Sequence, residues 1–152
     1  MSEKVIVRMN TNYQVGIWAV DPNQPDSEDF QPVSQIYELT PYGMMLASLA
    51  DCTGQVVVSY ARHHDVNLQE VELRADYERV FKDDCQDCEG IDRYDEYIQE
   101  QISFHGDLTD KDRQKLLKIA HQCPIHKMFL QGIEIRSNLV ENIEAGEKSL
   151  NA

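Results

Sequence analysis

The sequence predicts an α+β fold in which curved, mostly antiparallel sheets lie around one long buried helix. Two observations carry this prediction. Several stretches alternate apolar and polar residues, which is the two-residue period of a half-buried β-strand. One longer stretch, from 44 to about 64, repeats apolar residues at helical spacing on nearly all its faces. Along the chain the order is strands, long helix, strands, second helix and a last strand, which indicates helices packed on a mostly antiparallel sheet.

Six stretches carry the strand pattern. They are 5–7, 15–19, 33–37, 68–81, 97–104 and 132–140. Polar residues at 10–12 predict a turn between the first two stretches. The segment 21–27, with its prolines and acidic residues, predicts a loop. The stretch 68–81 is interpreted as one or two strands.

Two helices have clear start signals. Thr40 and Pro41 form a hydroxyl N-cap followed by proline at the first helical position, so the long helix begins there. Its apolar faces predict burial at the centre of the fold or in a subunit interface, and Cys52 lies in its middle. The capping box from Thr109 to Asp112 opens the second helix, which Pro124 interrupts or restarts.

The chain of 152 residues fits a single domain, 1–152, with an acidic insertion loop at 82–95 and a polar tail at 142–152. Apolar residues make up 41% and charged residues 27%, as in ordinary globular proteins. The acidic and tyrosine-containing run from Asp92 to Glu100 is interpreted as a solvated face. A net charge of -13 argues against a nucleic-acid partner and against an anionic membrane surface.

No apolar run approaches the roughly 20 residues that span a bilayer, and the first ten residues lack the apolar core of a secretory signal. We therefore expect a cytoplasmic, reducing location. In that setting the four cysteines are thiols, redox centres or metal ligands more often than structural disulfides.

Two motifs carry a family resemblance. The first is TPYGMMLASLADCT at 40–53, a proline-led helix with small and apolar residues up to a cysteine. The second combines GDLTD at 106–110 with LLKIAHQCPIH at 116–126, an amphipathic helix that ends in Cys-Pro-x-His. Together, in this order, they resemble the OsmC/Ohr family of thiol-dependent peroxidases (osmotically inducible protein C and organic hydroperoxide resistance protein).

The resemblance implies an OsmC-like fold, an intertwined homodimer and two active sites at the subunit interface. It makes Cys52 the peroxidatic thiol and Cys123 the resolving thiol, with an organic hydroperoxide as substrate and an external dithiol as reductant. No cofactor is expected. A thiolate attacks one peroxide oxygen and becomes a sulfenic acid, which a second thiol captures as a disulfide. That capture requires Cα atoms within about 7 Å of each other.

In the well-studied peroxidases of the family, an arginine lowers the thiol pKa by its opposite charge, and a glutamate ten residues before the first cysteine holds that arginine. The glutamate position is Tyr42 here, and Arg8 is the arginine that the N-terminal strands offer. Glu38, one helical turn further away, could replace the glutamate. His126, like His121, could support a thiolate as an imidazolium or be a polar residue at a helix end. Tyr42 and Met45 could line a hydroperoxide pocket or pack in the core.

Cys85 and Cys88 form a CxxC within the acidic stretch. One CxxC supplies half of a tetrahedral zinc site. A second dithiol for electron relay and an acidic loop with incidental cysteines are the other interpretations. The surrounding negative charge raises thiol pKa values and argues against a reactive thiolate.

Two functions fit the whole sequence. The first is a thiol-dependent peroxidase that uses Cys52 and Cys123. The alternative is a non-enzymatic OsmC-like protein that binds a small apolar molecule or senses redox state, because the arginine and glutamate partners are incomplete.

Overall fold

The computed structural model describes residues 2–81 and 94–143, and it confirms the predicted α+β class. The strands are β1 (Ser2–Asn10), β2 (Val15–Ala19), β3 (Gln31–Pro32), β4 (Leu68–Phe81) and β5 (Tyr94–Gly106). The helices are the short 3-10 turn η1 (Ile36–Glu38), α1 (Pro41–His63), α2 (Asp110–Ala120) and α3 (Pro124–Gln131).

The strands form one five-stranded sheet in the order β3-β2-β1-β4-β5, and each neighbouring pair is antiparallel. The stretch 68–81 is a single strand. Alternation works as predicted on β1, where Val5, Val7 and Met9 are buried under α1 while Arg8 is exposed. The face on which a residue lies therefore follows directly from its parity along each strand.

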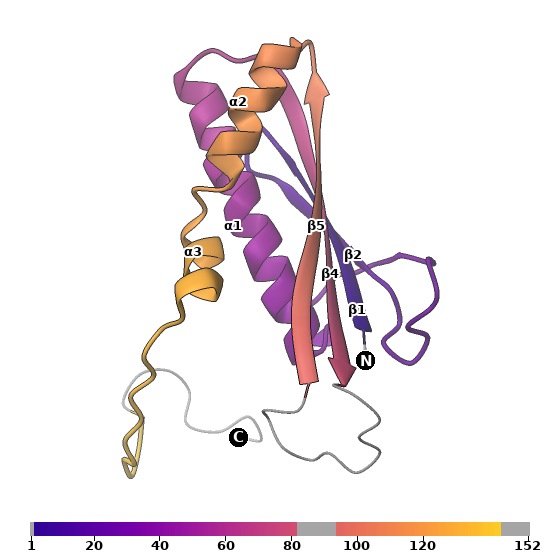
Figure 1. Ribbon diagram of the computed structural model, residues 1–152, viewed down its shortest axis with the longest axis vertical. Coiled ribbons are helices and arrows are strands. Elements are labelled where there is room, and N and C mark those ends of the chain that lie inside the picture. The colour runs from indigo at the N-terminus through magenta and orange to yellow at the C-terminus, as the bar shows by residue number, and fades with distance from the viewer. Residues whose placement is uncertain (1, 82–93, 144–152) are drawn as a thin grey trace.

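Helix α1 lies across one face of the sheet, and α2 and α3 pack beside α1 over that same face, near β5 (Figure 1). The main core fills the space between α1 and the sheet; Leu46 and Val57 from the helix meet Val7 and Leu73 from the strands, all at most 1% exposed. The buried central helix that the sequence predicts is confirmed.

The start of α1 is held as its sequence predicts. The Thr40 hydroxyl accepts a hydrogen bond from the Gly43 N–H at 3.1 Å and donates to the Glu3 carboxylate at 2.8 Å. Glu3 belongs to β1, so the N-cap also ties the helix to the central strand. Helix α2 begins with the complete capping box between Thr109 and Asp112.

The predicted strand at 33–37 is wrong. The extended pairing stops at Pro32, and the following residues turn into η1. Both the N–H and the hydroxyl of Ser34 donate to the Glu38 carboxylate, at 3.0 and 2.8 Å. This local turn satisfies polar groups that a strand would need for pairing, and it leaves Tyr37 75% exposed.

The predicted closing strand at 132–140 is also wrong. This segment has no regular secondary structure, and its apolar residues are exposed. A strand needs a hydrogen-bonding partner, and 132–140 pairs with no strand of the described sheet. Apolar alternation alone does not supply that partner.

The predicted acidic loop at 82–95 ends earlier than expected, because Tyr94 and Asp95 already belong to β5. Residues 82–93, with Cys85 and Cys88, lie outside the described residues, as does most of the predicted polar tail. None of the helices within 2–81 and 94–143 has the length and apolar character needed to cross a membrane.

Candidate functional site

The two motif cysteines, far apart in sequence, meet in the folded chain. Cys52 lies in the middle of α1, and Cys123 lies in the turn between α2 and α3. Both thiols are free, and they lie close enough for Cys123 to raise the pKa of Cys52. Because α2 and α3 pack on α1, the turn between them brings Cys123 to Cys52.

Both sulfurs lie at the N-terminus of α3. Cys123 is the N-cap, and its sulfur accepts a hydrogen bond from the N–H of His126 at 3.5 Å. The backbone N–H of Ile125 donates to the sulfur of Cys52. Pro124 has no N–H, so these are the first free donors of the helix. The positive end of the helix dipole therefore faces both thiols.

The two thiols differ in exposure. Cys123 is completely buried, whereas Cys52 is partly accessible. A reagent from solvent therefore reaches the sulfur of Cys52 more readily, and Cys123 can act only on what has already formed at Cys52.

The pKa of the Cys52 thiol is raised above its ordinary value. Burial is the main cause; the hydrogen bond with Cys123 and the negative charge of Asp51 also raise the pKa, while the N–H of Ile125 lowers it. Among the described residues, no arginine or lysine contributes to this shift. The single chain therefore keeps Cys52 mainly as a thiol at neutral pH.

Two predicted supporting residues lie elsewhere. Arg8 is on the face of β1 opposite α1, where it pairs with Glu72 and covers the ring of Trp18 at 4.7 Å. Glu38 is exposed in η1 and accepts hydrogen bonds from Ser34. Hydrogen bonds from Ser34 lower the pKa of Glu38. Neither residue contacts Cys52 within this chain.

Tyr42 does have an arginine partner, which the sequence interpretation missed. Arg79 of β4 donates a hydrogen bond to the Tyr42 hydroxyl and covers the ring of Tyr94 at 4.3 Å. The Tyr42 ring also stacks on Tyr77, with ring centroids 4.9 Å apart. Strand parity could have found this contact, because Arg79 lies on the same face of β4 as the buried residues Ala75 and Tyr77.

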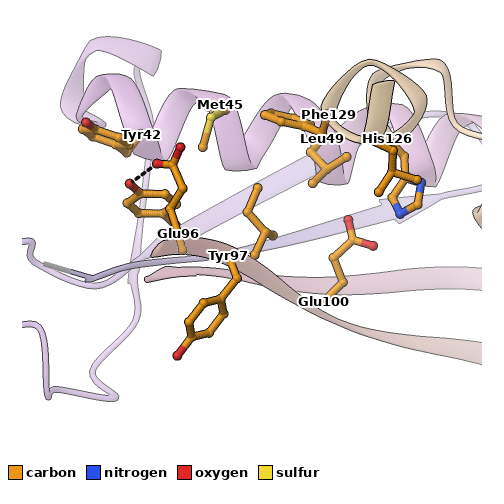
Figure 2. A pocket seen from close by; sticks show the side chains of 11 residues that line it. Tyr42, Met45, Leu49, Glu96, Tyr97, Glu100, His126 and Phe129 are labelled. Carbon is orange, nitrogen blue, oxygen red and sulfur yellow. Dashed lines mark hydrogen bonds between the residues drawn. The ribbon is translucent and has the colours of Figure 1, made fainter. Parts of the chain in front are cut away.

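A cavity of about 610 Å³ opens between α1, α3 and the strands β4 and β5 (Figure 2). Its lining residues are Tyr42, Met45, Leu49, Tyr77, Glu96, Tyr97, Ile98, Glu100, His126, Phe129 and Leu130. Leu49 precedes Cys52 by about one helical turn, and His126 holds Cys123 through its N–H, so the cavity reaches the neighbourhood of the thiol pair.

The predicted solvated face of Asp92, Asp95, Glu96 and Glu100 is exposed at Asp95 and Glu96 as expected, Asp92 lies outside the described residues, and Glu100 is the exception. Glu100 is half-buried and extends from β5 toward His126 of α3 (Figure 2). One of its carboxylate oxygens is buried without a hydrogen-bond partner among the described residues. Burial raises the pKa of Glu100, while His126 and His121 lower it. Strand parity places Glu96 and Glu100 on the same face as the inward residues Ile102 and Phe104.

His121 and His126 stack with ring centroids 5.9 Å apart beside the buried turn of Cys123. Within 2–81 and 94–143, no group of three or more His, Cys, Asp or Glu side chains is arranged to hold a metal ion. The metal prediction for Cys85 and Cys88 concerns residues outside those ranges and stays a prediction.

A thiol pair at a helix N-terminus, carried by helices on one face of an antiparallel sheet, defines a class of α+β thiol proteins. The family model described as OsmC-like protein matches residues 34–138, and the chain belongs to this family. Its fold is similar to the crystal structure of an OsmC-like hydroperoxide resistance protein from Jannaschia sp. CCS1. The TM-score is 0.57 at 15% sequence identity, over 91% of this chain and 93% of that one. No curated protein matches the chain.

Proposed function

We propose that the protein is a thiol-dependent peroxidase that reduces organic hydroperoxides at Cys52 and resolves the product with Cys123. The observation that carries this proposal is the direct contact between a partly accessible and a buried thiol. Family membership and the fold of the hydroperoxide resistance protein support it. The cavity next to this pair is large enough to hold the organic group of a hydroperoxide, which the reaction also requires.

The reaction proceeds in two steps at the sulfurs. The Cys52 thiolate attacks the terminal oxygen of the hydroperoxide, the O–O bond breaks, and the alkoxide takes a proton to leave as an alcohol. The Cys123 thiol then attacks the sulfenic sulfur of Cys52, which gives a disulfide and water. An external dithiol reduces this disulfide by exchange at the more accessible sulfur of Cys52. Such a cycle suits a reducing compartment such as the cytoplasm.

The raised pKa of Cys52 favours the second candidate function, a non-enzymatic OsmC-like protein that binds a small molecule or senses redox state. With a small thiolate fraction, the reaction with peroxide is slow. A slow reaction that ends in a disulfide suits a sensor, whereas a peroxidase needs an added cation near Cys52. Turnover rate therefore separates the two functions.

We further propose that the protein is a homodimer. The segment 132–143 leaves a row of apolar side chains in solvent, Ile133, Ile135, Leu139, Val140 and Ile143, each at least 51% exposed. Large exposed apolar surfaces of this kind mark interaction sites. Strand β5 is also a long sheet edge with one neighbour among the described strands. A second copy could cover both features and bring further charges to Cys52.

The test is hydroperoxide consumption with cumene hydroperoxide and dithiothreitol, followed by stopped flow. Cys52→Ser should abolish consumption, because the attacking sulfur is gone. Cys123→Ser should complete one turnover without dithiol, and excess peroxide should then convert Cys52 to a sulfinic acid that mass spectrometry detects.

The control is the double variant Cys85→Ser, Cys88→Ser, which keeps the Cys52–Cys123 pair. It should consume hydroperoxide at the wild-type rate. Equal rates for wild type and Cys52→Ser would overturn the peroxidase proposal. Loss of activity in the double variant would instead show that the CxxC relays electrons.

A further inference from the structure

We infer that the cavity between α1, α3 and β5 selects its ligands by charge: it accepts an apolar chain with a neutral or cationic polar end and rejects a carboxylate. This inference rests on the proposed function in that it names the substrate class. Neutral and cationic organic hydroperoxides are then substrates, whereas hydroperoxides of free fatty acids are not.

The size and walls of the cavity fit an aliphatic or aryl chain. A volume of about 610 Å³ lies within the range of small-molecule sites. Met45 and Leu49 of α1, Ile98 of β5 and Phe129 of α3 supply apolar surface from three elements (Figure 2). Binding a chain there removes apolar surface from water, which is the main source of affinity.

The charges at the cavity are unbalanced. Glu96 and Glu100 line it, and of the lining residues His126 alone can become cationic. The carboxylate of Glu96 accepts a hydrogen bond from the Tyr77 hydroxyl at 2.8 Å (Figure 2). Arg79 is not a lining residue; its guanidinium donates to the hydroxyls of Tyr42 and Tyr77, which line the cavity. A ligand carboxylate would thus meet two carboxylates, and no arginine or lysine is among the lining residues.

Because Glu100 is a hydrogen-bond acceptor at the cavity, a ligand with a hydrogen-bond donor at its polar end should bind more tightly. One of its oxygens is buried without a partner in the described part of the chain, and an unsatisfied buried acceptor is costly. Glu100 also lines the cavity, so a ligand hydroxyl, hydroperoxide O–H or ammonium group can donate to the accessible part of its carboxylate. A ligand carboxylate brings only acceptors and adds charge repulsion in a partly desolvated site.

The test uses three non-reactive probes with the same chain: decylammonium, decanol and decanoate, titrated into the whole protein by calorimetry below their micelle concentrations. We expect decanoate to bind at least about tenfold more weakly than decanol, and decylammonium to bind at least as tightly as decanol. Glu100→Gln keeps the shape of the side chain but removes its charge. In this variant, the affinities for decanol and decanoate should differ by less than about threefold.

Glu70→Gln is the matched control, since it removes one negative charge from a different hollow beside Arg8 and Trp18. This variant should leave the ratio of the affinities for decanol and decanoate unchanged. Absence of binding by all three probes, equal affinity for decanoate and decanol, or an unchanged ratio in Glu100→Gln would each overturn the inference.

A second experiment measures turnover of two substrates by the wild-type protein, so its result does not depend on whether a variant folds. It tests the charge selection separately from the peroxidase activity. The wild-type protein is offered linoleic acid hydroperoxide and its methyl ester, which differ in one charge. We expect kcat/KM for the ester to exceed that for the acid at least about tenfold. Consumption of neither by a protein that binds decanol overturns the peroxidase proposal alone. Equal kcat/KM for both overturns the charge selection alone.

Discussion

At the scale of single residues, the reactivity of Cys52 depends on a few opposing groups. Burial, Cys123 and Asp51 all favour the neutral thiol, and the N–H of Ile125 favours the thiolate. The sequence places Asp51 next to Cys52, which is an unfavourable neighbour for a nucleophile that works as an anion. Whatever activates this thiol must therefore overcome burial and a negative charge.

The first consequence is a pH profile. Since the pKa of Cys52 is raised, the thiolate is scarce at neutral pH, and alkylation of Cys52 by iodoacetamide should rise with pH to a midpoint above the ordinary value of about 8.5. Asp51→Asn should move the midpoint down by roughly a few tenths of a pH unit, because one negative charge is removed. Peptide mass spectrometry follows alkylation of each cysteine separately.

Asp65→Asn serves as the control, because Asp65 is exposed in the turn after α1 and does not contribute to the Cys52 pKa. Its midpoint should equal that of the wild type. A wild-type midpoint clearly below the ordinary thiol value would contradict burial as the dominant cause and would argue for an activating cation from a second copy.

At the scale of elements, the break between α2 and α3 creates the site. Cys123 has φ -57° and ψ 127°, an extended conformation that a following proline favours. Pro124 then starts α3 with its φ preset, so the next N–H groups point at the two sulfurs. An uninterrupted helix through 120–126 would leave those N–H groups bonded to its own carbonyls.

Pro124→Ala should therefore weaken the disulfide between Cys52 and Cys123. Alanine lets Cys123 sample helical conformations, and the lost preorganisation should lower the equilibrium constant of disulfide formation about two- to fivefold. The measurement is equilibration in glutathione redox buffers, with the reduced and oxidised forms separated after acid quenching.

Pro41→Ala is the matched control, since Pro41 starts α1 in the same way but lies far along the helix from Cys52. Its disulfide equilibrium should match that of the wild type. An unchanged equilibrium in Pro124→Ala would mean that packing of α2 on α1, and not the proline, positions Cys123.

At the scale of the whole molecule, the chain leaves unusual apolar surface uncovered. Ile135 is 83% and Leu139 98% exposed, although 132–140 carries the alternation of a strand. An exposed apolar surface of this kind is typical of an interaction site, and none of the described strands pairs with it. In the proposed homodimer, the second copy supplies a partner for this surface.

The double variant Ile135→Asp, Leu139→Asp should dissociate the dimer. Charges buried in an apolar interface without partners are costly, so the dissociation constant should rise at least about tenfold. Sedimentation equilibrium should show the mass of two chains for wild type and a shift to one chain for the variant. Asn138→Asp, an exposed change at the opposite parity of the same segment, should stay dimeric, and a monomeric wild type would contradict the proposal.

Local rules account for the parts of the fold that the sequence predicts correctly. Helix starts can be predicted from the sequence because their signals act between neighbouring residues. These signals are the N-cap at Thr40, the capping box at Thr109 and the proline at 124. Strands β1 and β4 alternate because one face is buried. The same rule failed at 33–37, where Ser34 and Glu38 form a local turn, and at 132–140, which pairs with no described strand.

By itself the sequence determined the fold class, the central helix and the two cysteine motifs, because each depends on local periodicity, capping or short spacing. Only the tertiary structure decided that Cys123 touches Cys52, that Arg8 faces away and that Glu100 enters a cavity. These features depend on how α2 and α3 pack on α1 and on which sheet face is covered. Strand parity gives the face on which Arg8 and Glu100 lie, but the contacts that they make there join separate elements, and no local pattern encodes those contacts.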